Sequence, residues 1–475
     1  MGRSVVDAVV VGSGPNGLVA AVTLAMAGRS VVVLEAEPTV GGGTRSGELT
    51  LPGFVHDICS AIHPLGAGSP VMTSLPLANH GLRWLHPTIA LAHPLDGGNA
   101  GLVYRDAAAT AHGLGVDGDA WTQHIVSLSR RWDDLLPMIL RPVVQLPRHP
   151  VTFARFGLPA LAPASVLADR WFSTDEARAL FAGCAAHAFL PLSSLMTSSF
   201  GLLLLAAAHA VGWPIAEGGS QAIADALASL LHLHGGQVVT NQRVTSFADI
   251  PNARVVLFDL APRQIADIAA ERLPDRFRSR LQRFRHGPGA FKVDYALSGP
   301  VPWRNEGSRS AGTVHVCGDA RDVARAEADV FAGRHPDRPF VLVGQQSVVD
   351  PTRAPSGCHT LWTYCHVPNG STVDMTEAIE RQIERFAPGF RDLILARHIA
   401  NPAWFEAHDS AYIGGDVGGG ANNAKQLVFR PVLGRPYRTP DPSVFMCSAS
   451  TPPGGGVHGM CGYNAAQVAL RGQLR

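Results

Sequence analysis

The stretch VVDAVVVGSGPNGLVAAVTLAMAGRSVVVLEAE, residues 5–37, decides the fold of this chain. Its apolar start predicts a strand that ends at Val11, and a helix through Ala27 follows. A second, β-branched strand then ends at Glu35. The turn between the first strand and the helix has a GxGxxG spacing, formed by Gly12, Gly14 and Gly17.

Each part of this unit has a physical task. Gly12 permits a tight turn, Gly14 lets the backbone approach a pyrophosphate, and Gly17 lets the helix pack closely on the strand. Glu35 lies 18 residues after Gly17, where its carboxylate can accept hydrogen bonds from a ribose hydroxyl. The unit therefore predicts a Rossmann-like, dinucleotide-binding domain, and by itself it does not distinguish a nicotinamide from a flavin.

Composition limits the number of domains and the kinds of partner that the chain can have. The chain has 475 residues, of which 46% are hydrophobic and 16% charged, which is enough for a large core and predicts two domains. A net charge of +1 without a basic stripe argues against nucleic-acid binding. Seven scattered cysteines without a CxxC pair predict neither a disulfide framework nor a metal site. The N-terminal residues lack the features of a signal peptide, so we expect a cytoplasmic location.

One long segment carries no charged side chain. Residues 179–216 contain no Asp, Glu, Lys or Arg, and their centre is FGLLLLAAAHAVGW. Pro191 and several serines leave the dense apolar part shorter than the roughly 20 residues that a bilayer-spanning helix needs. We expect a buried helix that lines an apolar cavity, and peripheral contact with a membrane is the alternative.

A second glycine motif follows the second strand. Residues 41–54 read GGGTRSGELTLPGF, with the doublet Gly41–Gly42 and then Arg45. The pattern resembles the flavin-binding motif of the amine oxidase and phytoene desaturase superfamily. In that superfamily the glycines bring the backbone close to the cofactor, and an arginine neutralises phosphate charge. Gly43 stands directly after the doublet, where the family commonly has arginine, so the resemblance gives that task to Arg45.

Three further segments fall in the family's order along the chain. Residues 215–244 resemble the segment in which a Gly-Gly-Ser turn begins a long helix, and Val244 matches the position that packs near adenine. VVLFDLAP, residues 255–262, resembles the strand that returns to the dinucleotide-binding sheet. PPGGGVHGMCG, residues 452–462, resembles the closing flavin motif, a glycine turn at the head of the last helix. That helix would point its N-terminus at the pyrimidine end of the isoalloxazine.

On these motifs the chain resembles the phytoene desaturase-like FAD-dependent oxidoreductases of the amine oxidase superfamily. Residues 287–297 and 414–431 are similar to the pyridine nucleotide-disulfide oxidoreductase domain 2-like branch. The resemblance implies an α/β fold, with a Rossmann-like FAD-binding domain of glutathione reductase type and an inserted α+β substrate domain. It places the FAD-binding domain in residues 1–79, 215–274 and 426–475, and the substrate domain in residues 80–214 and 275–425.

The motifs and the resemblance together assign contacts with FAD to a set of residues: Gly12, Gly14, Pro15, Gly17, Glu35, Gly41, Gly42, Arg45, Val244, Gly455, Gly456, Val457 and His458.

The chemistry of the class needs few protein groups. A flavin accepts a hydride at N5 from a C–H bond, and desaturation also needs a group that takes a proton. His458 is the catalytic candidate, and capping of the helix start is the alternative. Lys292 and Asp294 share one face of a strand, where an ion pair competes with an amine oxidase-like lysine beside N5. Ordinary hydrogen bonds, turn geometry or simple burial are expected for the remaining polar candidates, Asp57, His63, Asp416, Asn422 and Cys461.

Three functional hypotheses remain open. The first is an FAD-dependent, phytoene dehydrogenase-like enzyme that moves a hydride between flavin N5 and an apolar, isoprenoid or lipid-like substrate. The second is a flavin amine oxidase, which would line its site with an aromatic pair; the candidate is WTYCH, residues 362–366. The third is a non-catalytic FAD-binding regulatory protein. The sequence leaves open the substrate, the direction of the reaction, the electron acceptor and the oligomeric state, and we expect the FAD to be non-covalent.

Overall fold

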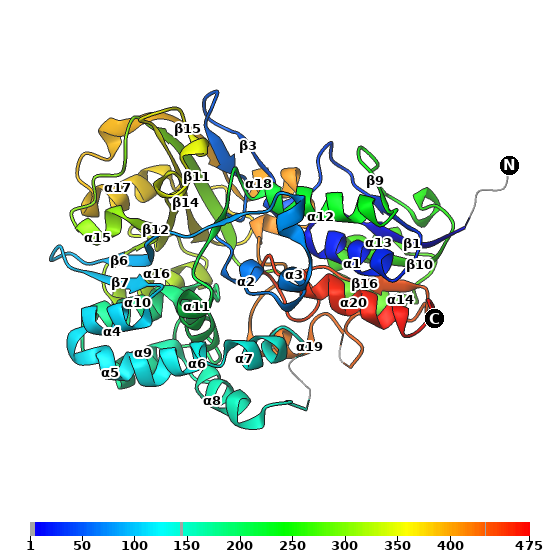
Figure 1. Ribbon diagram of the computed structural model, residues 1–475, viewed down its shortest axis with the longest axis horizontal. Helices are drawn as coiled ribbons and strands as arrows, with labels where there is room; N and C mark the ends of the chain where they lie inside the picture. Colours follow the sequence, from blue (N-terminus) through cyan, green and yellow to red (C-terminus); the bar gives the residue numbers. More distant parts are fainter. Residues whose placement is uncertain (1–4, 143–145, 433) are drawn as a thin grey trace.

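The computed structural model describes residues 5–142, 146–432 and 434–475, and it builds them around two sheets (Figure 1). A five-stranded parallel sheet lies toward the end that carries both chain termini. A seven-stranded, mostly antiparallel sheet lies toward the opposite end. We call them the parallel sheet and the mixed sheet. The predicted fold class is confirmed.

The parallel sheet is assembled from distant parts of the chain. Its strands all run in one direction, in the order β16-β10-β1-β2-β9. Because strands of this sheet come from near residue 6 and near residue 446, it is complete only when both ends of the chain meet. The strands are β1 (Val6–Val11), β2 (Val31–Leu34), β9 (Gln237–Val239), β10 (Ala253–Phe258) and β16 (Val444–Met446).

Helices cover both faces of the parallel sheet, as its continuous apolar strands require. In β1, Ala8 and Val10 belong to one buried cluster and Val9 and Val11 to another. On one face α1 (Pro15–Met26) packs against α12 (Gln221–Leu233) and α20 (Met460–Leu470), and on the other face lie α13 (Pro262–Ile268) and α14 (Asp275–Gln282).

All five strands of the parallel sheet lie within the segments predicted for FAD binding, although α14, just beyond the boundary predicted at residue 274, packs against α13. The domain boundaries themselves stay a prediction. Residues 1–4, 143–145 and 433, which those boundaries include, lie outside the described residues.

The mixed sheet has two different faces. Its strands follow the order β15-β11-β14-β13-β12-β6-β7. One face, with Val293, Val314 and Leu361, packs against α17 (Thr376–Phe386) in an apolar cluster. The strands are β6 (Ile89–Pro94), β7 (Ala100–Tyr104), β11 (Gly289–Leu297), β12 (Ala311–Val316), β13 (Val341–Gly344), β14 (His359–Val367) and β15 (Ile394–Ala400).

Helices close the other face of the mixed sheet. The charge-free segment forms most of α10 (Asp175–Ala186) and all of α11 (Ser198–Ala210), which pack against each other. α10 also packs against α16 (Ala320–Phe331). The remaining helices of this layer are α4 (Ala107–Gly113), α5 (Gly118–Trp121), α6 (Ser127–Ser129), α7 (Trp132–Ile139), α8 (Pro150–Ala160) and α9 (Ala164–Trp171).

Among the described residues, no single helix is both long and apolar enough to cross a membrane. α8 and α9 pass such a test as a pair, but they are bent by 102° at the break between them.

Candidate active site

A cavity of about 940 Å³ is lined by residues from both sheets. One part is bordered by the glycine loops that follow β1 and β2 and by the turn before α20. Another part is bordered by α8 and α11 and by strands of the mixed sheet. The volume lies at the upper end of the range typical of cofactor and ligand pockets.

The first glycine loop leaves no room for side chains. Gly12 has a φ of 99°, and a Cβ there would lie 2.8 Å from the carbonyl oxygen of Asp259. A Cβ on Gly17 would lie 2.2 Å from the carbonyl oxygen of Gly12, so α1 begins directly against the turn. The loop therefore has the close packing predicted for a dinucleotide cradle, and Pro15 begins α1 beside it.

Asp259 adds a carboxyl group to this cradle. It follows the end of β10, and its Oδ2 accepts a hydrogen bond of 2.7 Å from the backbone N–H of Gly17. Burial raises the pKa of Asp259 to about 7. Our sequence reasoning missed this residue. Its signal was its position at the carboxyl end of the strand next to β1, where parallel sheets bind ligands.

Glu35 is held at the end of β2. Its Oε2 accepts a hydrogen bond of 2.9 Å from the N–H of Ser13, and its Oε1 accepts one of 2.9 Å from the N–H of Glu37. The side chain is buried and lines the cavity. This fixed carboxylate has the position that recognition of a ribose requires.

The second glycine loop lies directly on the first. The N–H of Gly41 donates to the carbonyl oxygen of Ser13 over 3.0 Å, and a Cβ on Gly42 would lie 3.2 Å from the Cα of Gly14. Arg45 is buried at the cavity, and its Nε has no hydrogen-bond partner among the described residues. A buried guanidinium with an unpaired donor fits an anionic group such as a phosphate.

Val244 lies at the cavity, and its contact with adenine stays a prediction. It is buried and lines the cavity together with Gln242 and Arg243. The N–H of Gln242 donates to the carbonyl oxygen of Glu35 over 2.8 Å, so Val244 lies near the carboxyl end of β2. An adenine held by Val244 would therefore be close to a ribose held by Glu35.

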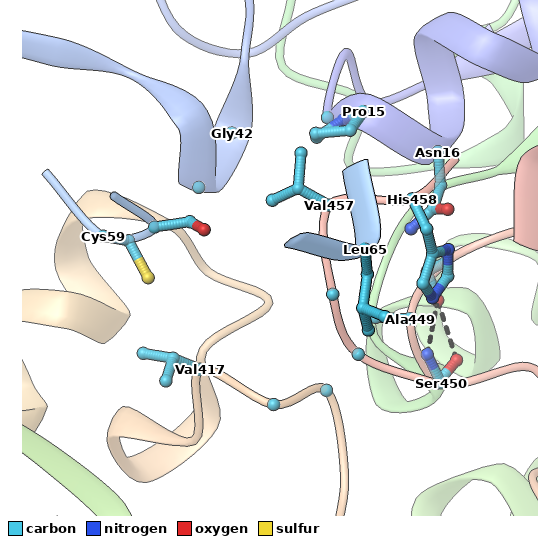
Figure 2. A pocket seen from close by; sticks show the side chains of 18 of the residues that line it. Pro15, Asn16, Gly42, Cys59, Leu65, Val417, Ala449, Ser450, Val457 and His458 are labelled. Carbon is cyan, nitrogen blue, oxygen red and sulfur yellow. Dashed lines mark hydrogen bonds between the residues drawn. The ribbon is translucent and has the colours of Figure 1, made fainter. Parts of the chain in front are cut away.

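The C-terminal glycine turn differs in one respect from the sequence prediction. The helix α20 begins at Met460, several residues after Gly454–Gly456, and Gly459 precedes it with a φ of 68°. Gly455 and Gly456 line the cavity with Val457 and His458. Figure 2 shows Val457 and His458 facing Gly42 and Cys59 across an opening. The turn, rather than the helix terminus, meets the cavity because the loop between them folds over the start of the helix.

His458 carries the hydrogen bond of a helix-start residue. Its Nδ1 accepts from the N–H of Met460 over 3.1 Å, and Nε2 has no partner among the described residues. Burial lowers the pKa of His458 to about 4, so the ring is neutral near pH 7 and its proton is on Nε2. The capping contact is thus present, and the catalytic role of His458 stays a prediction.

Lys292 and Asp294 form a buried ion pair on β11, and Lys292 lines the cavity. Two histidines flank the carboxylate: Nδ1 of His56 is 3.7 Å from Oδ1 of Asp294, and Nδ1 of His398 is 3.6 Å from Oδ2. The cluster is mixed in charge and wholly buried apart from His398, so it holds a cation at the wall of the cavity.

Aromatic rings and a thiol complete this wall. Trp362 and Tyr364 lie on β14 with ring centroids 5.0 Å apart, and both line the cavity. Cys59 lies opposite the glycine turn, and burial raises the pKa of its thiol to about 11 (Figure 2). Tyr412 packs so closely on the second glycine loop that a Cβ on Gly43 would lie 2.0 Å from its hydroxyl oxygen. Sequence reasoning missed Cys59 and Tyr412, which no motif marks.

The other polar candidates have structural partners. Asp57 is in a buried ion pair of 3.0 Å with Arg353, and His63 lies 2.8 Å from the hydroxyl of Ser220 through Nε2. Asp416 accepts hydrogen bonds from backbone N–H groups of two glycines, and Cys461 is a buried free thiol. Among the described residues no group of histidines, cysteines and carboxylates is arranged to hold a metal ion.

These residues fit FAD. The glycine loops form a cradle in which Cβ atoms would clash with neighbouring atoms. Nε of the buried Arg45 lacks a hydrogen-bond partner among the described residues. The parallel sheet, its two glycine loops and the adjoining apolar cavity define the class of protein: this is the fold of an FAD-dependent oxidoreductase.

Comparison with known proteins identifies a matching family model and a similar protein. A family model described as an NAD(P)-binding Rossmann-like domain matches residues 10–75. Over 98% of its length the chain is 26% identical to pyridine nucleotide-disulfide oxidoreductase domain-containing protein 2 of Rattus norvegicus, and it covers 93% of that protein. The predicted resemblance is thereby confirmed.

Solved structures share the fold across the whole chain. An oxidoreductase from Methanosarcina mazei superposes with a TM-score of 0.67 at 18% identity, covering 98% of this chain and 100% of that one. Wild-type putrescine oxidase bound to putrescine gives a TM-score of 0.62, also at 18% identity, with 98% of each chain covered.

Proposed function

We propose that the protein is an FAD-dependent dehydrogenase that removes a hydride from a C–H bond of an apolar, isoprenoid or lipid-like substrate. The observation that carries the proposal is the continuity of the cavity. It joins the glycine cradle to a pocket walled largely by apolar side chains.

The chain's own residues would hold the cofactor along the parallel sheet. The first N–H groups of α1 and the guanidinium of Arg45 would face the diphosphate, and Glu35 would bind the ribose. Asp259, whose pKa burial raises to about 7, would be protonated beside the phosphates below that pH. When bound, FAD supplies a hydride acceptor at N5.

The apolar part of the cavity would bind and dehydrate the substrate. α11 contributes Phe200, Leu203 and Leu204, and α8 contributes Phe153 and Phe156. Burying a hydrocarbon chain against such a wall stabilises the complex by roughly 25 cal/mol per Å² of apolar surface. The same wall keeps water away from the reacting bond.

The Lys292–Asp294 pair would place a positive charge at the cavity wall beside the reacting bond. Lys292 lines the cavity, and His56 and His398 stand beside Asp294. An ammonium already carries its proton, so Lys292 would orient the substrate and not take up the proton that desaturation releases. His458 has Nδ1 occupied by the N–H of Met460, and its ring is neutral near pH 7.

The experiment is anaerobic titration of the purified, FAD-loaded protein with apolar polyenes or long-chain lipids in detergent, followed by the visible flavin spectrum. Bleaching of the flavin bands supports the proposal. Leu203→Asp, which puts a charge into the cavity wall, should abolish bleaching while FAD content is retained. The matched control is Leu233→Asp on α12, because that leucine is 70% exposed and far from the pocket lining.

A second candidate, a flavin amine oxidase, is favoured by one observation. Trp362 and Tyr364 form a T-shaped aromatic pair in the cavity wall, where such an oxidase needs aromatic rings to guide an amine. Bleaching by aliphatic amines, and by no apolar substrate, would replace the first proposal with this one. A protein that holds FAD and is bleached by neither class would have the regulatory role instead.

A further inference from the structure

One end of the cavity is polar although it is far from the flavin cradle. It is lined by His187, Trp213 and Thr313, which we call the polar end. Ring centroids of His187 and Trp213 are 6.3 Å apart, and Trp213 lies 6.0 Å from His315, the next residue but one from Thr313 on β12. Nothing in the proposed hydride transfer uses these groups.

Strand register fixes how far the polar end lies from Lys292. Across the mixed sheet Lys292 pairs with Tyr364, Tyr364 with Leu342, and Leu342 with His315. Three steps of about 4.8 Å between strands separate Lys292 from His315 by roughly 14 Å. A substrate that reaches both ends must therefore be elongated, with an apolar middle against Leu342 and Tyr364.

Thr313 brings an unsatisfied hydroxyl to this end. The side chain is 3% exposed, and its Oγ1 has no hydrogen-bond partner among the described residues. A buried hydroxyl without a partner is unfavourable, because folding has removed its hydrogen bonds to water. A ligand group that bonds to it would recover this energy.

The histidines define which kind of group fits. Nε2 of His93 lies 2.8 Å from the carbonyl oxygen of Gly318, which only accepts, so His93 carries its proton on Nε2 and a lone pair on Nδ1. A Cβ on Gly183 would lie 3.0 Å from that Nδ1 and 2.6 Å from Nδ1 of His315. Neither Nδ1 has a hydrogen-bond partner among the described residues, so both tautomers of His315 are compatible with these contacts.

The histidine contacts continue to the cavity. Nε2 of His315 lies 3.2 Å from Nε2 of His187, so one of the two rings donates to the other. Nδ1 of His187 carries a lone pair if its Nε2 donates and a proton if its Nε2 accepts. That nitrogen makes no hydrogen bond within the described part of the chain, and His187 lines the cavity. The polar end therefore offers an imidazole nitrogen of His187 and the hydroxyl of Thr313.

Burial keeps all three rings neutral. It lowers the pKa of His187 to about 3 and of His93 to about 4, and it lowers the pKa of His315 well below its usual value. Nδ1 of His366, on β14, lies 2.8 Å from Oε1 of Glu327, and His366 adds to the lowering of the pKa of His187. Neutral groups at this end select a neutral polar group of the ligand rather than an ion.

We propose that the polar end binds the hydroxyl group of an otherwise apolar, elongated substrate. The hydroxyl bonds to Nδ1 of His187 and to Oγ1 of Thr313, because a hydroxyl both donates and accepts. This inference rests on the proposed function for the reaction at the other end, and it narrows the substrate class to hydroxylated hydrocarbons long enough to span the roughly 14 Å between Lys292 and His315.

The test is calorimetric titration of the FAD-loaded protein with decanol and with decyl methyl ether, which differ in the ability to donate. We expect the alcohol to bind roughly tenfold more tightly, the value of one well-made hydrogen bond. Thr313→Val and His187→Phe should each lower the affinity for the alcohol to that of the ether. Thr363→Val, on the opposite face of the same sheet, is the matched control and should keep the preference.

Equal affinities for the two probes in the wild-type protein, or a preference that survives in both variants, overturns the inference. Failure of the proposed function gives a different result. In that case no apolar substrate bleaches the flavin, while the protein still binds the alcohol more tightly than the ether. His187→Asn keeps a side-chain acceptor and should recover part of the preference for the alcohol. A purely structural role for the ring predicts no recovery.

Discussion

At the scale of single residues, Asp259 is the group that ties cofactor binding to pH. Its carboxyl accepts from the N–H of Gly17, at the helix start where a diphosphate would lie. Burial raises its pKa from 3.8 to about 7, so below that pH the carboxyl is neutral and tolerates phosphate oxygens. Above it an ionised carboxylate repels them.

We therefore expect FAD to be held less tightly as the pH rises through about 7. Asp259→Asn keeps an acceptor for Gly17 and removes the charge, so its FAD affinity should not fall in that window. Flavin fluorescence, which reports released FAD, measures the difference. A wild-type affinity that is flat across the window would contradict the assignment.

Asp259 also makes the free energy of unfolding depend on pH. The folded chain keeps a proton on Asp259 between 3.8 and about 7, where the unfolded chain has lost it. The contribution of Asp259 to the free energy of unfolding is therefore present below 3.8 and lost as the pH rises toward 7. The melting temperature of the wild type should therefore fall relative to that of Asp259→Asn as the pH rises toward 7.

At the scale of elements, the contact between α1 and α20 joins the two ends of the chain. A Cβ on Gly462 would lie 1.8 Å from the carbonyl oxygen of Asn16, so α20 packs on the backbone of α1. Gly462→Ala must push the helices apart, and we expect a loss of about 1–3 kcal/mol in the free energy of unfolding. Because α1 begins at the cradle and α20 follows the glycine turn that lines the cavity, the variant should also release FAD.

The matched control is Gly113→Ala, at the end of α4. A Cβ there meets nothing within 4 Å, and the position has no positive φ. Replacing such a glycine should leave stability unchanged or raise it slightly, by up to about 1 kcal/mol. Urea unfolding curves for Gly462→Ala and Gly113→Ala measure the difference in stability. Equal midpoints would show that the contact between α1 and α20 is unimportant.

At the scale of the whole molecule, exposed apolar side chains gather at the mouth of the cavity. Leu158 and Leu161 line the cavity and are 73% and 55% exposed. Three further exposed apolar residues lie nearby in the chain, namely Leu146, Val151 and Val166. The exposed Arg148 and Arg155 give the segment a basic margin. Such a surface favours peripheral contact with a lipid bilayer, from which an apolar substrate could enter directly.

We expect the protein to float with vesicles of phosphatidylcholine and phosphatidylglycerol, and the double variant Leu158→Ser, Leu161→Ser to lose most of this binding. Leu233→Ser, at a comparably exposed leucine on α12, is the control that should bind as the wild type does. Absence of flotation, with sedimentation showing that the same double variant breaks a dimer, would assign the surface to a second copy of the chain.

How much could be predicted differs by part of the molecule. Residues 5–37 predict β1, α1 and β2 almost to the residue, because local periodicity and glycine spacing carry that information. The segments that hold β9, β10 and β16 were found by resemblance. The start of α20 was placed too early, because a run of glycines marks a turn without saying where the helix after it begins.

The sequence by itself determined the dinucleotide cradle, because its glycines and Glu35 act within one short βαβ unit. It also determined that residues 179–216 are too apolar to be exposed. Only the tertiary structure decided what meets across the cavity: Asp259 at the start of α1, Lys292 in the wall, and His187 beside Thr313 at the polar end. These contacts join strands and helices hundreds of residues apart, and no local pattern encodes such distances.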